Sequence, residues 1–216
     1  MSDNYIIPII SYLLGAIPSG FLLLKFLHSK DIRDSGSGNV GAMNSYESTG
    51  NKSTGIIVFL LDSLKGVAAV LIANEIAPGD TYLLMMAAVF CVLGHNYNIF
   101  LKFSGGRGLA PAAGILLIIS PIGLFLWCLM YVSSYFVITR NIHAANFAAS
   151  ITAPILLFGM PGELTGTLNQ IVINDFTQLK AGYALIAFLI ILRHAKPLRD
   201  LIKSDENIFN SSDEDN

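Results

Sequence analysis

Charge is scarce in this chain. Only 13% of its 216 residues are Asp, Glu, Lys or Arg, whereas 53% are apolar. Soluble domains carry about 25% charged residues, so the composition excludes an ordinary soluble domain. We therefore predict that most of the chain lies in lipid.

Cysteine is scarce too, and Cys91 and Cys128 both lie inside apolar runs. They predict no disulfide framework and are typical of small core residues. No two of the four histidines have an i, i+4 spacing, so we expect no metal site and no cofactor. With a formal net charge of −2, the chain is also not expected to bind nucleic acid.

Apolar runs of bilayer length alternate with polar segments. A helix needs about 20 residues to cross the hydrocarbon core. We predict an all-α polytopic membrane protein of about seven transmembrane helices, at 5–27, 55–73, 81–94, two within 109–138 that meet at Ser120–Pro121, 144–158 and 177–192. Gly15 and Gly20 indicate close helix packing, and the Gly-, Ser- and Asn-rich segment 31–54 indicates a loop.

Lysine and arginine are missing from every second loop. Seven spans place eleven cations on one side, namely Lys25, Lys30, Arg33, Lys52, Lys102, Arg107, Arg140, Arg193, Lys196, Arg199 and Lys203. By the positive-inside rule this side is the cytoplasm, which predicts an N-out, C-in topology. We expect one membrane domain over 1–203, followed by an acidic, disordered cytoplasmic tail at 204–216.

Four polar clusters fall on this same side. They are 35–44 with Ser35, Ser37, Gly38, Asn39 and Asn44; 94–108 with His95, Gly105, Gly106, Arg107 and Gly108; 140–143; and Arg193–His194. Glycines free the backbone N–H groups for an anion, and a guanidinium adds a bidentate phosphate partner. Taken alone, the Arg107 stretch is more typical of a glycine-rich turn with an interfacial arginine. Convergence of four clusters favours a shared site for an anionic ligand.

Two charges interrupt the predicted span 55–73. Asp62 and Lys65 are three residues apart and share one helix face. Each charge at mid-bilayer costs about 3 kcal/mol, so the two side chains must pair, face the bundle interior or line a polar cavity. The sequence leaves a structural pair and a site-lining pair both open.

The motifs resemble those of a known family. Its signatures are matched by SYLLGAIPSG at 11–20, DIRDSGSGNVGAMN at 31–44, the Asp62…Lys65-Gly66 helix, GHNYNIFLKFSGGRGLA at 94–110 and LRHAKPL at 192–198. The chain, except for its acidic tail, resembles the bacterial acyl-phosphate-dependent glycerol-3-phosphate acyltransferases, small seven-span enzymes of the inner membrane.

The resemblance implies an activity and a place. An acyl group would pass from acyl phosphate to the 1-hydroxyl of sn-glycerol 3-phosphate, giving lysophosphatidic acid in phospholipid synthesis. The site would face the cytoplasm at the edge of the bacterial inner membrane, in contact with lipid. No serine or cysteine lies in a recognisable nucleophile motif, so direct attack by the bound hydroxyl is expected.

The resemblance also assigns roles to residues. His95 and His194 are the candidate catalytic bases or orienting groups. The predicted phosphate-binding set is Ser35, Ser37, Gly38, Asn39, Asn44, Gly105, Gly106, Arg107, Gly108 and Arg193.

Several positions depart from the family pattern, and three of them concern the site most. Glu47 stands where the family has arginine, His143 falls near a family serine, and Pro197 replaces asparagine. These departures leave open a diverged paralogue that acylates another hydroxyl compound. A transporter would also account for the Asp62–Lys65 pair, and a lipid-binding protein without activity is the remaining alternative.

Overall fold

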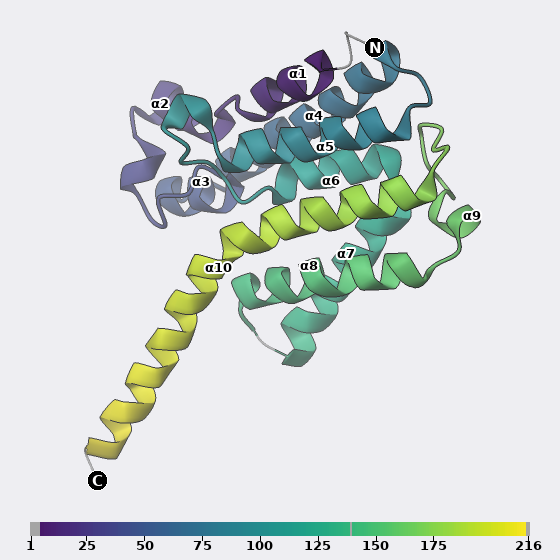
Figure 1. The fold of residues 1–216 in the computed structure, drawn as a ribbon. Coiled ribbons are helices and arrows are strands. Elements are labelled where there is room, and N and C mark those ends of the chain that lie inside the picture. Colours follow the sequence, from purple (N-terminus) through teal and green to yellow (C-terminus); the bar gives the residue numbers. More distant parts are fainter. Residues whose placement is uncertain (1–4, 139, 215–216) are drawn as a thin grey trace.

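The computed structural model describes residues 5–138 and 140–214, with the side chains of Ile138, Ile202 and 204–214 excepted. The described residues form an all-helical bundle, which confirms the predicted fold class (Figure 1). In chain order the elements are α1 (Ile6–Gly15), α2 (Ser19–His28), η1 (Ile32–Asp34), α3 (Ala42–Thr49), α4 (Lys52–Ile76), α5 (Thr81–Asn96), η2 (Ile99–Leu101), α6 (Leu109–Ile119), α7 (Pro121–Ser133), the π-helical turn η3 (Ser134–Ile138), α8 (Ile142–Gly159), α9 (Gly162–Thr165) and α10 (Phe176–Glu214).

Among the described residues, five helical segments are long and apolar enough to cross a membrane. They are Ile6–His28, Lys52–Ile76, Thr81–Leu101, Ile142–Gly159 and Phe176–Leu201, and the shorter apolar helices are Leu109–Ile119 and Pro121–Val137. Large apolar side chains such as Leu64, Phe125 and Ile155 are exposed on the outside of the bundle, as expected for a surface in contact with lipid. The number of crossings and their orientation stay predictions.

The first apolar run is two helices rather than one. Pro18 lacks an N–H and disfavours the helical backbone conformation at the preceding residue. Helix α1 therefore ends at Gly15, and α2 starts at Ser19. Close packing at the two glycines is confirmed. A Cβ atom at Gly15 would overlap the carbonyl of Cys91, and one at Gly20 would overlap that of Val40.

The prediction of a loop over 31–54 is wrong. The segment contains η1, all of α3 and the start of α4. The polar side chains that indicated a loop serve as helix caps: Asp31 Oδ1 accepts from Arg33 N at 3.0 Å, and Asn51 Oδ1 accepts from Ser53 N at 2.9 Å. Gly50, at φ +68°, ends α3.

The turn predicted at Ser120–Pro121 is confirmed. Ser120 Oγ accepts from Gly123 N at 3.3 Å, and Pro121 takes the first helical position of α7.

Helix α1 packs on α5, α4 on α6, α7 on α8, and α10 on both α5 and α8. Cys91 is buried in the core as predicted, whereas the core assignment of Cys128 is wrong because its side chain is exposed on α7.

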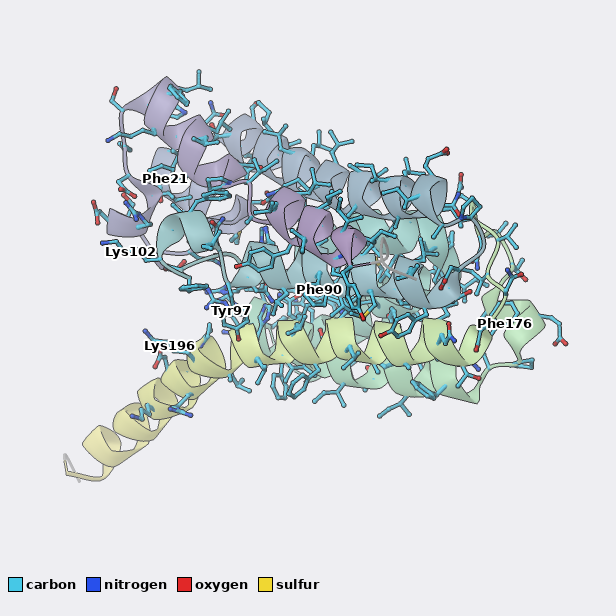
Figure 2. All side chains as sticks on the ribbon, turned by 45° about the horizontal axis from the view of Figure 1, so that its top comes forward. Phe21, Phe90, Tyr97, Lys102, Phe176 and Lys196 are labelled. Atoms are coloured by element: carbon cyan, nitrogen blue, oxygen red, sulfur yellow. The ribbon has the colours of Figure 1, made fainter. Side chains whose placement is uncertain are left out.

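Helix α10 runs far beyond the predicted span 177–192. The charges at 193–199 were interpreted as its end, but Lys, Arg and Leu all favour helix, so the backbone continues. It passes Pro197 and projects from the bundle (Figure 1), and Lys196 lies near the point where it leaves (Figure 2). Its backbone reaches Glu214, but the side chains of 204–214 and residues 215–216 lie outside the described part, so the disordered tail stays a prediction.

Candidate active site

A cavity of about 380 Å³ opens among α3, α4, α6, α7, α8 and α10. Its polar lining includes Asn39, Asp62, His95, Arg107, His143 and His194, with Asn146 and Ser150 on α8. Each of the four polar clusters predicted to converge therefore supplies at least one lining residue. The rest of the lining is mainly apolar, so the cavity suits a molecule with an anionic part and a hydrocarbon part.

Glycines let the 105–108 turn lie directly against the end of α5. Gly106 N donates to His95 O at 2.9 Å. A Cβ atom at Gly105 would overlap the carbonyl of His95, and one at Gly106 would overlap its imidazole ring. Gly108 has φ +84°, in the left-handed region that favours glycine. Gly105 and Gly106 are therefore needed for the close approach of the turn to the end of α5.

Arg193 fixes the same turn from α10. Its Nε donates to Gly106 O at 2.9 Å and its Nη2 to Gly105 O at 2.7 Å. The guanidinium also lies 5.5 Å from the centroid of the Tyr97 ring, which stands beside α10 in Figure 2. Arg193, predicted to bind phosphate, thus holds the turn that presents Arg107.

Arg107 projects from this turn and lines the cavity. Its Nη1 lies 3.2 Å from Nδ1 of His143. Burial lowers the pKa of Arg107, Arg193 adds to the lowering, and Glu47 opposes it. A guanidinium remains charged at neutral pH, and partial burial strengthens its attraction for an anion.

His194 offers an unused hydrogen-bond acceptor. The ring is fully buried, and Nδ1 lies 2.8 Å from Ile190 O. Because a carbonyl only accepts, Nδ1 must carry the proton, and Nε2 of the neutral ring is a bare acceptor. This Nε2 is buried and has no hydrogen-bond partner among the described residues. It is suited to take the proton of a bound hydroxyl.

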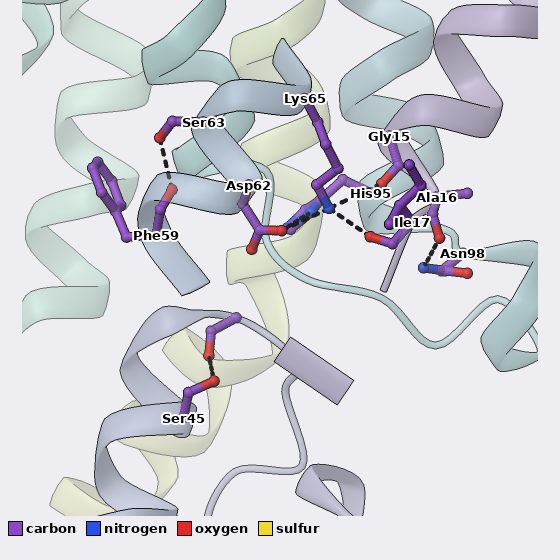
Figure 3. Close-up of polar contacts among 11 residues, drawn as sticks. Gly15, Ala16, Ile17, Ser45, Phe59, Asp62, Ser63, Lys65, His95 and Asn98 are labelled. Carbon is purple, nitrogen blue, oxygen red and sulfur yellow. Dashed lines mark hydrogen bonds and ion pairs between the residues drawn. The ribbon is translucent and has the colours of Figure 1, made fainter. Parts of the chain in front are cut away.

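The Asp62–Lys65 pair serves both roles that the sequence left open. Lys65 Nζ lies 2.6 Å from Asp62 Oδ1 and donates to Ile17 O at 2.6 Å, which ties α4 to the break after α1 (Figure 3). Asp62 also lines the cavity and lies 3.9 Å from Nδ1 of His95. Asn98 Nδ2 donates to Ala16 O at 2.6 Å at the same break (Figure 3).

The 31–44 segment is held together by Asn44. The two N–H groups of its Nδ2 are shared among the carbonyls of Ile32, Ser35 and Asn39, at 3.1, 3.0 and 2.8 Å, and its Oδ1 accepts from Ser37 N. Gly38, at φ +69°, provides a turn within the segment. Only Asn39 of the five residues predicted here lines the cavity, and the Asn44 amide is committed to the segment itself.

The apolar wall was not predicted from the sequence. Much of it comes from one face of α10, with Tyr183, Ile186, Ala187 and Ile190 leading to His194. Their i, i+3, i+4, i+7, i+11 spacing was a usable signal. Trp127 adds to the wall, and its Nε1 donates to Ser150 Oγ at 3.2 Å. In the part of the chain that the structure describes, no three His, Cys, Asp or Glu side chains are grouped as metal ligands.

Comparison with known proteins assigns the chain to a family. Residues 5–204 match the profile described as "Glycerol-3-phosphate acyltransferase". A protein of that name from Syntrophotalea carbinolica is 34% identical over 213 residues, which is 97% of this chain and 99% of the relative. A "Glycerol-3-phosphate acyltransferase 2" from Moorella thermoacetica is 39% identical over 149 residues, 69% of this chain and 75% of the relative.

A solved structure agrees with this assignment. The crystal structure of PlsY (YgiH), an integral membrane glycerol 3-phosphate acyltransferase in its glycerol 3-phosphate form, has a TM-score of 0.77 and 32% identity over 94% of each chain. Its lysophosphatidic acid form has a TM-score of 0.75 and 31% identity over 94% of this chain and 93% of that one. The resemblance of the motifs is thereby confirmed, and the chain belongs to the glycerol-3-phosphate acyltransferase family, as an integral membrane acyltransferase.

Proposed function

We propose that this acyltransferase moves an acyl group from acyl phosphate to the 1-hydroxyl of sn-glycerol 3-phosphate. One observation carries the proposal: Arg107, His194 and an apolar wall line the same cavity, and the buried Nε2 of His194 has no hydrogen-bond partner among the described residues. The guanidinium suits the phosphate, the imidazole suits the hydroxyl, and the wall suits the acyl chain.

The chemistry needs no covalent intermediate on the protein. The 1-hydroxyl oxygen attacks the acyl carbonyl carbon and forms the ester bond, while the bond between that carbon and the phosphate oxygen breaks. His194 Nε2 accepts the hydroxyl proton and passes it to the released phosphate, which restores the neutral imidazole. Arg107 stabilises the negative charge that develops on the acyl phosphate. The products are lysophosphatidic acid and inorganic phosphate.

The second candidate histidine has a different environment. His95 is buried, its Nε2 lies where a side chain at Gly106 would stand, and Asp62 lies near its Nδ1. We assign His95 to holding the 105–108 turn and His194 to the proton transfer. Of the other residues predicted to bind phosphate, Asn39 and Gly108 also line the cavity, and Asn39 brings a polar side chain that can contact the substrate.

The direct test is an assay of purified protein with acyl phosphate and sn-glycerol 3-phosphate, in which phosphate release and ester formation are followed together. Equal amounts of the two products are expected. Turnover with another alcohol but not with glycerol 3-phosphate would contradict the acceptor and favour the diverged paralogue. Absence of turnover with any acceptor would favour a transporter or a lipid-binding protein.

A matched variant tests direct attack. Cys128 also lines the cavity, and Cys128→Ser is expected to keep its activity because the hydroxyl attacks without a thioester. Loss of activity in this variant, together with an acyl group trapped on the wild-type protein, would point to a cysteine nucleophile.

We also propose that the site faces the cytoplasm from a bacterial inner membrane, within one membrane domain over 1–203. The eleven cations on one side of the predicted topology support this orientation. A cysteine in place of the exposed Glu163, in the Cys128→Ser background, is expected to react with an impermeant maleimide in intact cells after outer-membrane permeabilisation. Reaction only after the inner membrane is opened would overturn the orientation.

A further inference from the structure

His143 stands at the first turn of α8, where the backbone fixes its position. Asn141 caps the helix, and its Oδ1 accepts from His143 N at 2.8 Å and from Ala144 N at 3.2 Å. The half-buried His143 side chain lines the cavity, and its ring lies 6.2 Å from that of His194. The ring is therefore held in the candidate site by a rigid element.

The contact with Arg107 has a defined direction. Nη1 of Arg107 and Nδ1 of His143 are 3.2 Å apart. A guanidinium has only donors, so Nδ1 accepts and the proton of the neutral imidazole is on Nε2. Arg107 therefore needs a hydrogen-bond acceptor at the position of His143 Nδ1.

The two arginines of the site are held in different ways. Arg193 has its Nε and Nη2 occupied by two backbone carbonyls, and its planar group is fixed by the turn. Arg107 comes from the turn itself and meets the side chain of His143. A long arginine side chain loses much rotamer freedom when it binds an anion, and a contact that fixes it beforehand reduces this cost.

We infer that His143 is a positioning residue that holds the Arg107 guanidinium in the cavity by accepting its hydrogen bond at Nδ1. This inference rests on the proposed function in that the anion held by Arg107 is the phosphate of the acyl donor. It gives a role to a position that departs from the family pattern. Arg107 contacts the substrate, and His143 acts through it.

Two substitutions separate this role from simple packing. His143→Asn keeps an acceptor oxygen three bonds from Cα, where Nδ1 stands, and His143→Phe keeps a ring without an acceptor. For His143→Phe we expect kcat/KM for acyl phosphate to fall about tenfold, mostly through KM, while KM for glycerol 3-phosphate stays within about twofold. His143→Asn is expected to stay within about threefold of the wild type.

Binding of inorganic phosphate by isothermal titration calorimetry gives a readout without turnover, and thermal unfolding of each detergent-solubilised variant checks the fold. Weaker phosphate binding in His143→Phe but not in His143→Asn supports the inference, even if the wild type proves inactive and the proposed function fails. The inference is overturned if the two variants bind phosphate equally well. It is also overturned if the wild type binds no phosphate at millimolar concentration.

Discussion

Two glycine-rich segments, 35–44 and 105–108, look alike in the sequence but are built differently. In both, a polar side chain donates to backbone carbonyls of the segment; it belongs to the segment itself in the first and to α10 in the second. In the first, the Asn44 amide donates to the carbonyls of Ser35 and Asn39, so it has no donor left for a ligand. In the second, Arg193 donates to the carbonyls of Gly105 and Gly106. The side chain of Arg107 in the same turn lines the cavity.

The difference shows how to separate a folded loop from a binding loop. Glycine and polar side chains are needed in both, because both backbones make tight turns. A binding loop leaves a charged group facing a cavity, as Arg107 does, near an acceptor that lacks a partner, as His194 Nε2 does. If this comparison is right, substitutions in the two segments will divide between activity and stability.

The largest effect is expected at Arg107. Arg107→Ala removes the charge that faces the donor phosphate, and we expect kcat/KM to fall about 1,000-fold or more. The unfolding midpoint should change little, because the Arg107 side chain contacts His143 rather than the packed core. Arg107→Lys is the matched control: it keeps the charge without the planar fork and should recover part of the rate. A stable Arg107→Ala enzyme with normal activity would remove the distinction between the segments.

Arg193 is expected to come next. Arg193→Met keeps much of the apolar stem but frees the carbonyls of Gly105 and Gly106, so the turn loosens and kcat/KM should fall about 10- to 100-fold. Arg193→Lys can still donate to a carbonyl, and its loss should be smaller. Steady-state kinetics with varied acyl phosphate measure both. Equal losses in the two variants would mean that the Arg193 guanidinium itself contacts the substrate.

Much of this arrangement could be predicted from the sequence. The all-helical class, the Ser120–Pro121 turn and the buried packing of Cys91 follow from apolar runs, a proline and residue size. Helix α3 could not be predicted, because its polar residues also suit a loop and its two cap positions, Gly41 and Gly50, are glycines, which turns also favour. The exposure of Cys128 depends on how α7 faces the cavity, which apolar composition alone does not encode.

The role of Asn44 also lies beyond local sequence. Its side chain contacts carbonyls five, nine and twelve residues earlier in the chain, and only the folded segment shows that its amide is fully used. The tautomer of His194 depends likewise on the carbonyl of Ile190, which an ordinary helix turn brings to its ring. Motifs identify such residues, but hydrogen-bond partners decide what each one does.

Asn44 provides the stability half of the comparison. Asn44→Ala removes the side-chain partner of Asn39 O and of Ser37 N–H and leaves Ile32 O and Ser35 O with a backbone donor only, so we expect the free energy of unfolding to fall by about 2–3 kcal/mol. Activity should drop less than in Arg107→Ala when it is measured well below the unfolding midpoint. Asn39→Ala is the control, since Asn39 lines the cavity and its Oδ1 is buried with no partner among the described residues. A stability loss in Asn39→Ala as large as in Asn44→Ala would contradict the assignment.

The smallest effect is expected at Glu47, which follows the first segment on α3. Glu47 is exposed on α3, and its charge acts on Arg107 in the direction that opposes the effect of burial. A carboxylate there competes with phosphate for the same guanidinium, so Glu47→Arg should raise kcat/KM for acyl phosphate about two- to fivefold at low salt. The gain should shrink as ionic strength rises, because the interaction crosses solvent. Glu163→Arg makes the same charge change on α9, away from the cavity lining, and should leave the rate unchanged. A fall in activity in Glu47→Arg, with Glu163→Arg normal, would give Glu47 a role of its own in holding the acceptor.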